Sequence, residues 1–528
     1  MYSFFLVCPV AFLGFTICYL VYVELFPHPF PKSLPLVGFR KEIFSRPRAS
    51  FRQILGSSQT LAEGYEQYGA AGRPYVVPDT TFQPQVMLPQ NHIKWLSTQP
   101  ESVLSSEAVR VERNGINYLP VKSDLKSSVL FIDKIIGKSL SQNLDLIQPD
   151  MYDEIRHTVD STMGTDVASW REVNLSEAMS TIIDRTGNRI LFGLSLCRNE
   201  VYLRILRCFI IFMGASTLLI GQLPPWFLRP IAGVLITIPT FIFKKLSVAY
   251  VRPLVKERMQ SVSGEEDDQG PGKTSHDFVT QSINSVRKFK ITIEGDVASY
   301  LAEQFLFLAF AAMATTGAAA TNIFLDILSA SPQINLYELL HLEAASIFKS
   351  EADWMSPSSM KEMINTDSAI RESLRKNTLQ SRGLLKQVMP KDGIMLPDGA
   401  HVPHGMWLGV PAQAMQNDDE FYPNADGYDP LRFARLKADA EAECKDGPSS
   451  GKHLDAAHPS DKYLSFSYGR SSCPGRWFAV RLLKLIIAYI AVHYDIKPLA
   501  HRPKNFSFGD ASIPSFTTKI MVRRRKQG

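Results

Sequence analysis

The residues around Cys473 have the clearest potential for chemistry in this 528-residue sequence. Cys473 precedes an apolar stretch with helical spacing, and Arg470 and Arg476 lie three residues to either side. The positive end of a helix dipole and two arginines favour a thiolate over a thiol. Gly469 and Gly475 lack side chains, so a flat, bulky group could approach the backbone there. A thiolate with glycines on both sides suits a cysteine bound to haem iron. A buried structural cysteine would not require these arginines and glycines.

This segment resembles the cysteine signature of the cytochrome P450 family. The signature has Phe seven residues before the cysteine and glycines four before and two after it, and Phe466, Gly469 and Gly475 occupy these places. The resemblance implies a haem b cofactor whose iron is bound by Cys473. The cofactor-binding residues that it implies are Cys473, Phe466, Gly469, Arg470 and Gly475.

Two upstream elements would hold the cysteine loop in place. Glu372 and Arg375 lie one helical turn apart, a spacing that by itself usually gives an exposed ion pair worth little. The pair resembles the Glu-x-x-Arg helix of the family, and Tyr428–Phe433 resembles its Pro-x-Arg-Phe element. The resemblance implies a buried structural cluster of Glu372, Arg375 and Arg432 that locks the cysteine loop to the core.

A long apolar stretch, Glu294–Leu328, contains small residues that lead into Thr315 and Thr316. Small residues in mid-helix leave room for a ligand, and a threonine hydroxyl can bond the carbonyl one turn back. The alternative is a close helix–helix contact with threonine as filler. The family has its oxygen-binding motif here, which implies that Thr315 helps to deliver protons, with Thr316 as the second catalytic candidate.

Three positions depart from the family pattern. Ala314 stands where the family usually has Asp or Glu, so proton delivery would use water, a threonine hydroxyl or a substrate group. Ser471 replaces the basic residue that often faces a haem propionate, which shifts that contact toward Arg470. The stretch Val129–Asn143 has lysines but none of the Trp, His or Arg residues that the family uses on an early helix.

Composition and the remaining motifs exclude several other classes. The net charge of +5 is too small to indicate nucleic-acid binding, and six cysteines are too few for a disulfide framework. The five cysteines other than Cys473 are expected to be packing residues. His401 and His404 are predicted to lie on surface turns, because no further ligands complete a metal site. No dinucleotide or flavin fingerprint appears, and the resemblance implies that electrons from NADPH arrive through a separate NADPH-cytochrome reductase.

Two apolar regions indicate membrane contact. Phe4–Phe26 is long enough to span a bilayer, and it lacks the basic start and cleavage site of a signal peptide. The basic residues that follow mark its C-terminal side as cytoplasmic. Cys208–Phe243 is interrupted by glycine and proline, which favours interfacial helices over two further spanning helices. The final basic residues, Arg523–Lys526, are predicted to form a solvated tail.

The periodicity predicts a mainly α protein with a small β region. The expected helices are Glu294–Leu328, Ser358–Thr378 and Pro474–His493, and the expected strands are Arg73–Val77, Gly393–Leu396 and His401–Val402. The order of the motifs implies a P450-like fold with one large catalytic domain. We expect a transmembrane anchor at residues 1–26, a stiff proline-rich link at 27–48 and a haem-binding monooxygenase domain at 49–528.

The resemblance implies a single-pass enzyme of the endoplasmic reticulum that oxidises a lipophilic small molecule in the cytosol. The substrate pocket is expected to be lined by Val103–Leu119, Phe307, Phe310 and Ala311. Similarity to fungal enzymes implies a terpenoid, indole diterpene or polyketide intermediate of secondary metabolism. Two alternatives remain: a haem-thiolate isomerase or dehydratase without net oxygen insertion, to which Ala314 points, and a membrane-anchored haem carrier or sensor.

Overall fold

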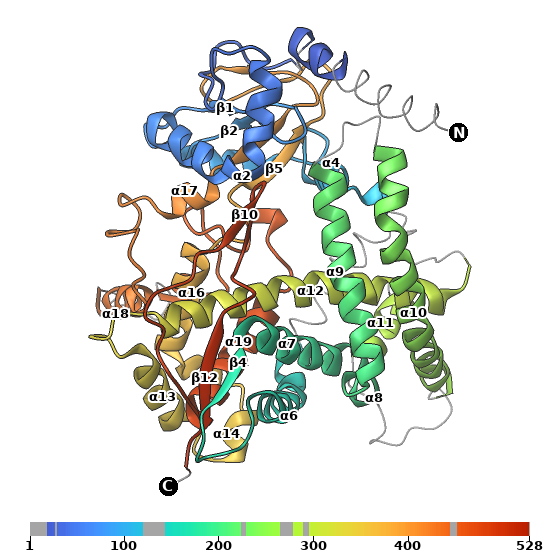
Figure 1. The fold of residues 1–528 in the computed structure, drawn as a ribbon, viewed down its shortest axis with the longest axis vertical. Coiled ribbons are helices and arrows are strands. Elements are labelled where there is room, and N and C mark those ends of the chain that lie inside the picture. Colours follow the sequence, from blue (N-terminus) through green and yellow to red (C-terminus); the bar gives the residue numbers. More distant parts are fainter. Residues whose placement is uncertain are drawn as a thin grey trace, which may run out of the picture.

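The computed structural model describes residues 18–26, 29–119, 143–222, 229–264, 278–288, 295–443 and 451–526. In Figure 1 the helix α12 crosses the middle of the molecule, with β1, β2 and β5 above it and α6, α7 and α14 (Glu351–Met355) below it. The described part is therefore mainly helical with small sheets, as the periodicity predicts. The helices that build the body are α2 (Ser45–Gly64), α6 (Leu144–Met163), α7 (Leu175–Phe192), α9 (Glu200–Gln222), α10 (Arg229–Gly264), α12 (Val297–Leu328), α13 (Leu336–Ile347), α16 (Ile364–Lys376), α18 (Arg432–Glu443) and α19 (Arg476–His493).

Helix α12 forms the centre of the largest hydrophobic core, where it packs against α7, α9 and α10. The sequence predicts its start at Glu294, but the structure begins it at Val297. Gly295 explains the difference, because its φ of +87° lies in the left-handed region that only glycine adopts readily.

The single helix expected over Ser358–Thr378 is two helices, α15 (Ser359–Glu362) and α16. They are separated at Met363, whose ψ of 68° is incompatible with helix continuation. The C-terminal helix α19 begins at Arg476, two residues later than predicted, because Pro474 and Gly475 belong to the preceding turn.

The main sheet has five strands in the order β1-β2-β8-β5-β3. Only β2 and β8 pair in parallel, and the other neighbours are antiparallel. Side chains alternate along β5, and Leu384, Lys386 and Val388 share its buried face. The strands of this sheet are β1 (Tyr75–Val77), β2 (Gln85–Met87), β3 (Leu104–Ser105), β5 (Gly383–Val388) and β8 (Trp407–Val410). The two strands predicted near residue 400 form a separate hairpin of β6 (Ile394–Met395) and β7 (His401–Val402).

The prediction of a solvated basic tail is wrong for the C-terminal residues. Arg523 and Arg524 belong to β12 (Lys519–Arg524), which pairs with β4 (Arg171–Asn174) and β9 (Tyr494–Ile496). Arg523 forms an ion pair of 3.0 Å with Asp495, and Arg524 pairs with Asp160. Carboxylates on neighbouring elements therefore hold these arginines in the sheet.

The N-terminal link is bound to the body more closely than a stiff spacer would be. Of the predicted anchor the structure describes residues 18–26, which are helical through residue 25. The backbone at Pro35 and Val37 hydrogen bonds to Val76 of β1 at 2.9 Å in both directions. Because α2 begins at Ser45, the last residues of the predicted link belong to a helix.

Candidate active site

The cysteine loop lies between the short helix η6 (Gly469–Ser471) and α19, as the motif predicts. The Cys473 N–H donates to the carbonyl of Phe466 at 2.9 Å, which closes the loop. Gly469 has a φ of +67°, and a Cβ there would lie 2.9 Å from the Cβ of Ser97. At Gly475 a Cβ would meet no atom within 4 Å. One glycine is thus required for close packing, and the other borders open space beside the cysteine.

The electrostatics of the Cys473 sulfur differ from the sequence-based expectation. The backbone N–H groups of Gly475 and Arg476 hydrogen bond to it, and together with the Arg476 guanidinium they lower its pKa. Burial among surrounding groups outweighs them, so the pKa of the Cys473 thiol is raised overall. The helix N–H groups and Arg476 thus favour a thiolate as the sequence indicates, and burial opposes them. Iron ligation does not depend on this balance, because a coordinated metal ion deprotonates a thiol directly.

Thr315 and Thr316 lie on different sides of α12. Thr315 is exposed together with Ala311 and Ala314, and its hydroxyl donates to the Ala311 carbonyl at 2.8 Å. Thr316 is buried on the side of Met313, whose sulfur lies 3.7 Å from the Asn188 amide of α7. Thr315 therefore lies on the exposed side of α12 with the small side chains, and Thr316 lies on the buried side.

Glu372, Arg375 and Arg432 come together as the sequence predicts. The Glu372 carboxylate is fully buried and accepts two hydrogen bonds of 2.8 Å from Arg375 and two of 3.2 Å from Arg432. The Asp429 N–H adds a further hydrogen bond of 3.2 Å. These five bonds surround the carboxylate with donors, so its charge is fully compensated inside the protein.

The same cluster fixes the chain segment that leads into the cysteine loop. Arg375 donates to the Ala425 carbonyl at 2.8 Å, and Arg432 donates to the Pro423 carbonyl at 2.6 Å. Ser465 donates to a carbonyl of α16 at 2.9 Å, and the side chain of Gln416 accepts from the Leu464 N–H at 2.7 Å. Gln416 had no signal in the sequence, because its partner is a backbone amide 48 residues away.

Lys386 is a site residue that sequence reasoning missed. It lies on the buried face of β5, and its ammonium donates to the Gln99 carbonyl at 3.4 Å. Burial lowers the pKa of Lys386, and the nearby charge of Arg470 lowers it further, while Glu101 opposes them. Two cations therefore lie close together beside the cysteine loop. A lysine at an inward position of an alternating strand was the signal that could have revealed it.

The remaining predictions have mixed outcomes. Phe307 and Phe310 are partly buried, with ring centroids 6.3 Å apart, and Ala311 is exposed. His401 and His404 are exposed and bond the backbone carbonyls of Asp392 and Pro390, and His401 lies in β7 rather than on a turn. No group of potential metal ligands forms within the described ranges. The predicted pocket segment contains α4 (Ser106–Arg113) and η3 (Ile116–Tyr118). Of the predicted stretch Val129–Asn143, only Asn143 is among the described residues.

The predicted packing role of the cysteines holds for Cys197, which is buried, whereas Cys208 is partly buried. Cys18 is exposed, so the expectation of a packing role is wrong there within the described residues. Cys8 and Cys444 lie outside the described residues.

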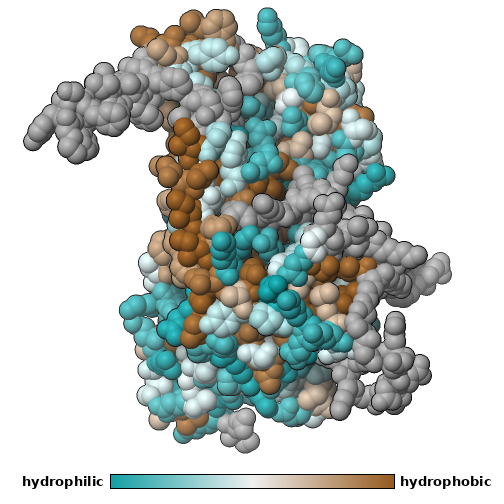
Figure 2. Space-filling model, turned by 90° about the vertical axis from the view of Figure 1, so that its right-hand side faces the viewer, coloured by the Kyte–Doolittle hydropathy of each residue, from teal (hydrophilic) through white to brown (hydrophobic). Residues whose placement is uncertain are grey.

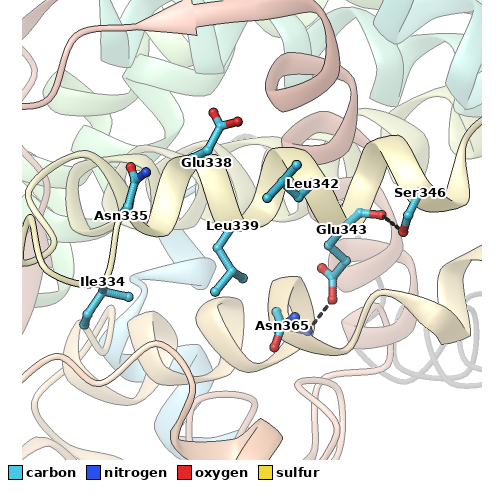
Figure 3. Close-up of a pocket in the computed structure, with 8 residues that line it drawn as sticks. All are labelled: Ile334, Asn335, Glu338, Leu339, Leu342, Glu343, Ser346 and Asn365. Atoms are coloured by element: carbon cyan, nitrogen blue, oxygen red, sulfur yellow. Dashed lines mark hydrogen bonds between the residues drawn. The ribbon is translucent and has the colours of Figure 1, made fainter.

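An open groove of about 600 Å³ lies away from these residues, along α13. Figure 3 shows Glu343 reaching from α13 toward Asn365 at the start of α16. The Glu343 carboxylate accepts hydrogen bonds from the N–H groups of Asn365 at 2.6 Å and Thr366 at 2.9 Å. It caps the helix that carries Glu372, which gives this groove a structural explanation.

Comparisons with known proteins agree with the motifs. A family model described as Cytochrome P450 matches residues 139–522. The chain is 35% identical over 493 residues to cytochrome P450 monooxygenase efuH of Hormonema carpetanum, which covers 93% of this chain and 86% of that protein. It is 35% identical over 524 residues to cytochrome P450 monooxygenase fsoD of Humicola fuscoatra, with 96% and 95% covered. Cytochrome P450 monooxygenase nodZ of Hypoxylon pulicicidum is also 35% identical, over 472 residues, with 88% and 87% covered.

Proposed function

The chain belongs to the cytochrome P450 family, and we propose that Cys473 is the residue that binds its haem iron. As a member of that family the protein is a haem-thiolate monooxygenase that receives electrons from a separate reductase. Haem with a cysteine ligand supplies the activation of dioxygen. The observation that carries the assignment is the Cys473 loop, closed by the bond to Phe466 and followed directly by α19.

The residues around Cys473 fit a flat cofactor that carries two carboxylates. Gly475 leaves open space on one side of the cysteine, and the small side chains of Ala311 and Ala314 leave it on α12. Lys386 and Arg470 place two positive charges near the loop, where carboxylates would compensate them. Within this proposal Phe466 and Gly469 shape the loop, and Lys386 and Arg470 hold the propionates.

The protein's own contribution to the reaction is orientation and proton handling. Thr315 presents a hydroxyl on the exposed side of α12, and no Asp or Glu occurs in the sequence between Glu303 and Asp326. We assign proton delivery to the Thr315 hydroxyl together with water, since Ala314 has no exchangeable proton. Thr316 is buried beside Met313, and it is the second candidate for proton delivery.

The cluster of Glu372, Arg375 and Arg432 is assigned a structural role. Its carboxylate has no free acceptor position, so it is poorly suited to exchange a proton with a substrate. The hydrogen bonds from Arg375 and Arg432 to the carbonyls of Pro423 and Ala425 hold that segment against α16.

We assign residues 1–26 to a membrane anchor of the endoplasmic reticulum, residues 27–48 to the link and residues 49–528 to the catalytic domain on the cytosolic side. The apolar sequence of the first segment and the basic residues after it support this arrangement. The aromatic side chains of Phe307 and Phe310, which we assign to the substrate pocket, favour a lipophilic substrate. Fungal relatives favour an intermediate of secondary metabolism, such as a terpenoid, indole diterpene or polyketide.

Turnover under labelled dioxygen tests the proposal. The full chain, combined with an NADPH-cytochrome reductase and candidate lipophilic intermediates, should give a product that contains one labelled oxygen atom. A product without label would contradict oxygen insertion and would favour the isomerase or dehydratase alternative. A substrate that changes the haem absorbance would count against a haem carrier or sensor.

A further inference from the structure

Four buried charged side chains form an alternating row between the main sheet and α4. Asp510 pairs with Arg113, the last residue of α4, and Arg382 pairs with Asp79. All four side chains are at most 10% exposed. Burial raises the pKa of Asp79, but the charges of Arg382 and Arg113 contribute to lowering it overall, so Arg113 also lies near Asp79. The row is neutral, because its two cations alternate with two anions.

Asp510 belongs to a hairpin turn that backbone hydrogen bonds hold in place. The turn joins β10 (Phe506–Phe508) to β11 (Ala511–Ile513). The carbonyl of Asp510 accepts from the Ser381 N–H at 2.8 Å, and the Gly509 N–H donates to a carbonyl of α2 at 2.7 Å. The Asp510 carboxylate therefore has a fixed position, and α4 is the element that it secures.

A second ion pair holds the same end of α4 from another side. Glu112 lies 3.5 Å from Arg229, the first residue of α10, and the Glu112 side chain is 32% exposed. A long, partly exposed ion pair contributes little to stability, so the buried pair of Arg113 with Asp510 is the stronger attachment. A helix of eight residues is not stable by itself, and the position of α4 therefore depends on such contacts.

Helix α4 lies between two regions that we assign to the haem pocket. On one side it packs against β5, which carries Lys386. On another side it meets the end of α9, where a Cβ at Gly221 would overlap the Arg113 carbonyl. Further along α9, Gly214 faces the ring of Phe310 on α12. In Figure 1 α4 accordingly lies beside β5 at the upper end of α9. A shift of α4 would therefore alter the pocket boundary that these elements form.

The start of α10 covers the segment that follows α4. Gly233 packs so closely against η3 that a Cβ there would lie 2.8 Å from the Cβ of Tyr118. Side chains on the other side of α10, such as Val234 and Leu235, are exposed, and Figure 2 shows a vertical band of apolar surface on this side of the molecule. Helix α10 thus separates η3 from that surface, and α4 with η3 has β5, α9 and α10 as neighbours.

We propose that Arg113 is a positioning residue of the substrate pocket, which through its ion pair with Asp510 holds α4 in the place that fixes the shape of the ligand-binding space. This inference rests on the proposed function, because it takes α4, within the predicted pocket segment, as a wall beside the haem. Arg113 acts through α4 and does not touch the reacting atoms. A wall that is already in place when a ligand arrives lowers the cost of binding, since less motion is lost. Loss of the pair should therefore weaken the binding of ligands that contact the wall and spare ligands too small to reach it.

Azole binding to the full chain with its haem tests the positioning role with two probes. Imidazole is small enough to contact little more than the iron, whereas clotrimazole is an imidazole with three aromatic rings that must contact the pocket wall. The shift of the haem absorbance gives both dissociation constants. Asp510→Asn keeps the size of the side chain but removes its charge. It should weaken clotrimazole binding about tenfold, while imidazole binding stays within about twofold of the parent.

Further variants distinguish a positioning role from a general loss of structure. Asp510→Glu restores the charge and should recover most of the affinity for clotrimazole. Asp510→Asn combined with Arg113→Gln should weaken clotrimazole binding no more than either change alone, because each change breaks the same contact. The matched control is Glu154→Gln on α6, which removes a fully buried carboxylate from an ion pair with Arg198 and should leave both affinities unchanged.

Two results in Asp510→Asn would overturn the positioning role of Arg113: an unchanged affinity for clotrimazole, or an equal loss for both azoles. If that variant does not retain haem, Arg113→Lys supplies the same comparison, because it keeps the charge but loses the planar guanidinium. It should weaken clotrimazole binding about threefold, and the same two results would overturn the proposal. A parent chain whose haem absorbance responds to neither azole would instead contradict the proposed haem site, on which the inference rests.

Discussion

Buried charges have many hydrogen-bond partners in the Glu372–Arg375–Arg432 cluster and few beside the Cys473 loop. In the cluster one carboxylate receives five hydrogen bonds from Arg375, Arg432 and a backbone amide. Beside the cysteine loop the buried Lys386 has one long bond to a carbonyl; the Glu101 carboxylate raises its pKa, and the like charge of Arg470 lowers it.

This difference separates scaffold from site. Charges that are completed inside the protein stabilise the fold, and their loss leaves an isolated charge in a medium of low polarity. Cations with few hydrogen bonds inside the protein are suited to an anionic ligand that arrives from outside. The two regions should therefore respond differently to mutation: the first in stability and the second in cofactor binding and turnover.

The largest effect is expected from Glu372→Ala. It leaves Arg375 and Arg432 facing each other without a carboxylate and should lower the free energy of unfolding by about 3–5 kcal/mol. Urea unfolding measures the loss, and haem content should fall with it. The matched control is Glu351→Ala, whose ion pair with Arg156 is exposed and should contribute less than about 1 kcal/mol. Equal losses in the two variants would contradict the distinction between the regions.

Lys386→Ala should weaken haem binding with little effect on the fold. A charge-assisted hydrogen bond contributes about 1.5–3 kcal/mol, which corresponds to roughly 10–100-fold faster haem loss. Transfer of haem to an excess of apomyoglobin measures that rate. Lys386→Arg keeps the charge and should restore most of the retention. If haem loss is unchanged in the alanine variant, the propionates bind elsewhere.

Thr315→Ala should reduce product formed per NADPH by about tenfold, because the hydroxyl on the open side of α12 is lost. The electrons should appear as hydrogen peroxide, which a peroxidase assay quantifies beside the product. Thr315→Ser supplies the conservative rescue. Thr316→Ala is the internal control, since that residue is buried toward α7; a larger effect there would reverse the assignment of the two threonines.

The smallest effect concerns the scaffold near the end of α19. His493 packs against Tyr489 at 4.4 Å, and burial together with Arg524 lowers the pKa of His493 to about 4, while Asp160 opposes this. The unfolded chain therefore takes up a proton below pH 6.5 that the folded chain does not bind, so stability falls as the pH drops. Between pH 7 and pH 6 we expect a loss of less than about 1 kcal/mol, and His493→Gln should remove it. If the free energy of unfolding of His493→Gln depends on pH as steeply as that of the parent, the low pKa of His493 is contradicted.

The sequence predicted those parts of the site that depend on short spacing. Cys473 with its glycines and the Glu372–Arg375 pair lie within single segments, and the family pattern supplied Arg432. Their arrangement in the structure agrees with that prediction. The long helix was also recognised, because its apolar run spans many turns.

Features that depend on contacts between distant segments were missed. Lys386 becomes a site residue because β5 places it near Arg470, which is 84 positions further along the chain. The break at Met363 follows from capping by Glu343 on another helix. The terminal arginines looked solvated because Asp160 and Asp495 are remote in sequence. The raised pKa of Cys473 likewise depends on packing that local sequence does not reveal.

The most direct test of iron ligation by Cys473 is the carbon monoxide difference spectrum of reduced Cys473→His, compared with the parent chain. The parent should show the band typical of a thiolate ligand, and the variant, if it retains haem, should lose that band. Haem content measured separately distinguishes loss of the ligand from loss of the cofactor. A thiolate-type band that persists in the variant would show that another residue binds the iron and would contradict the central claim.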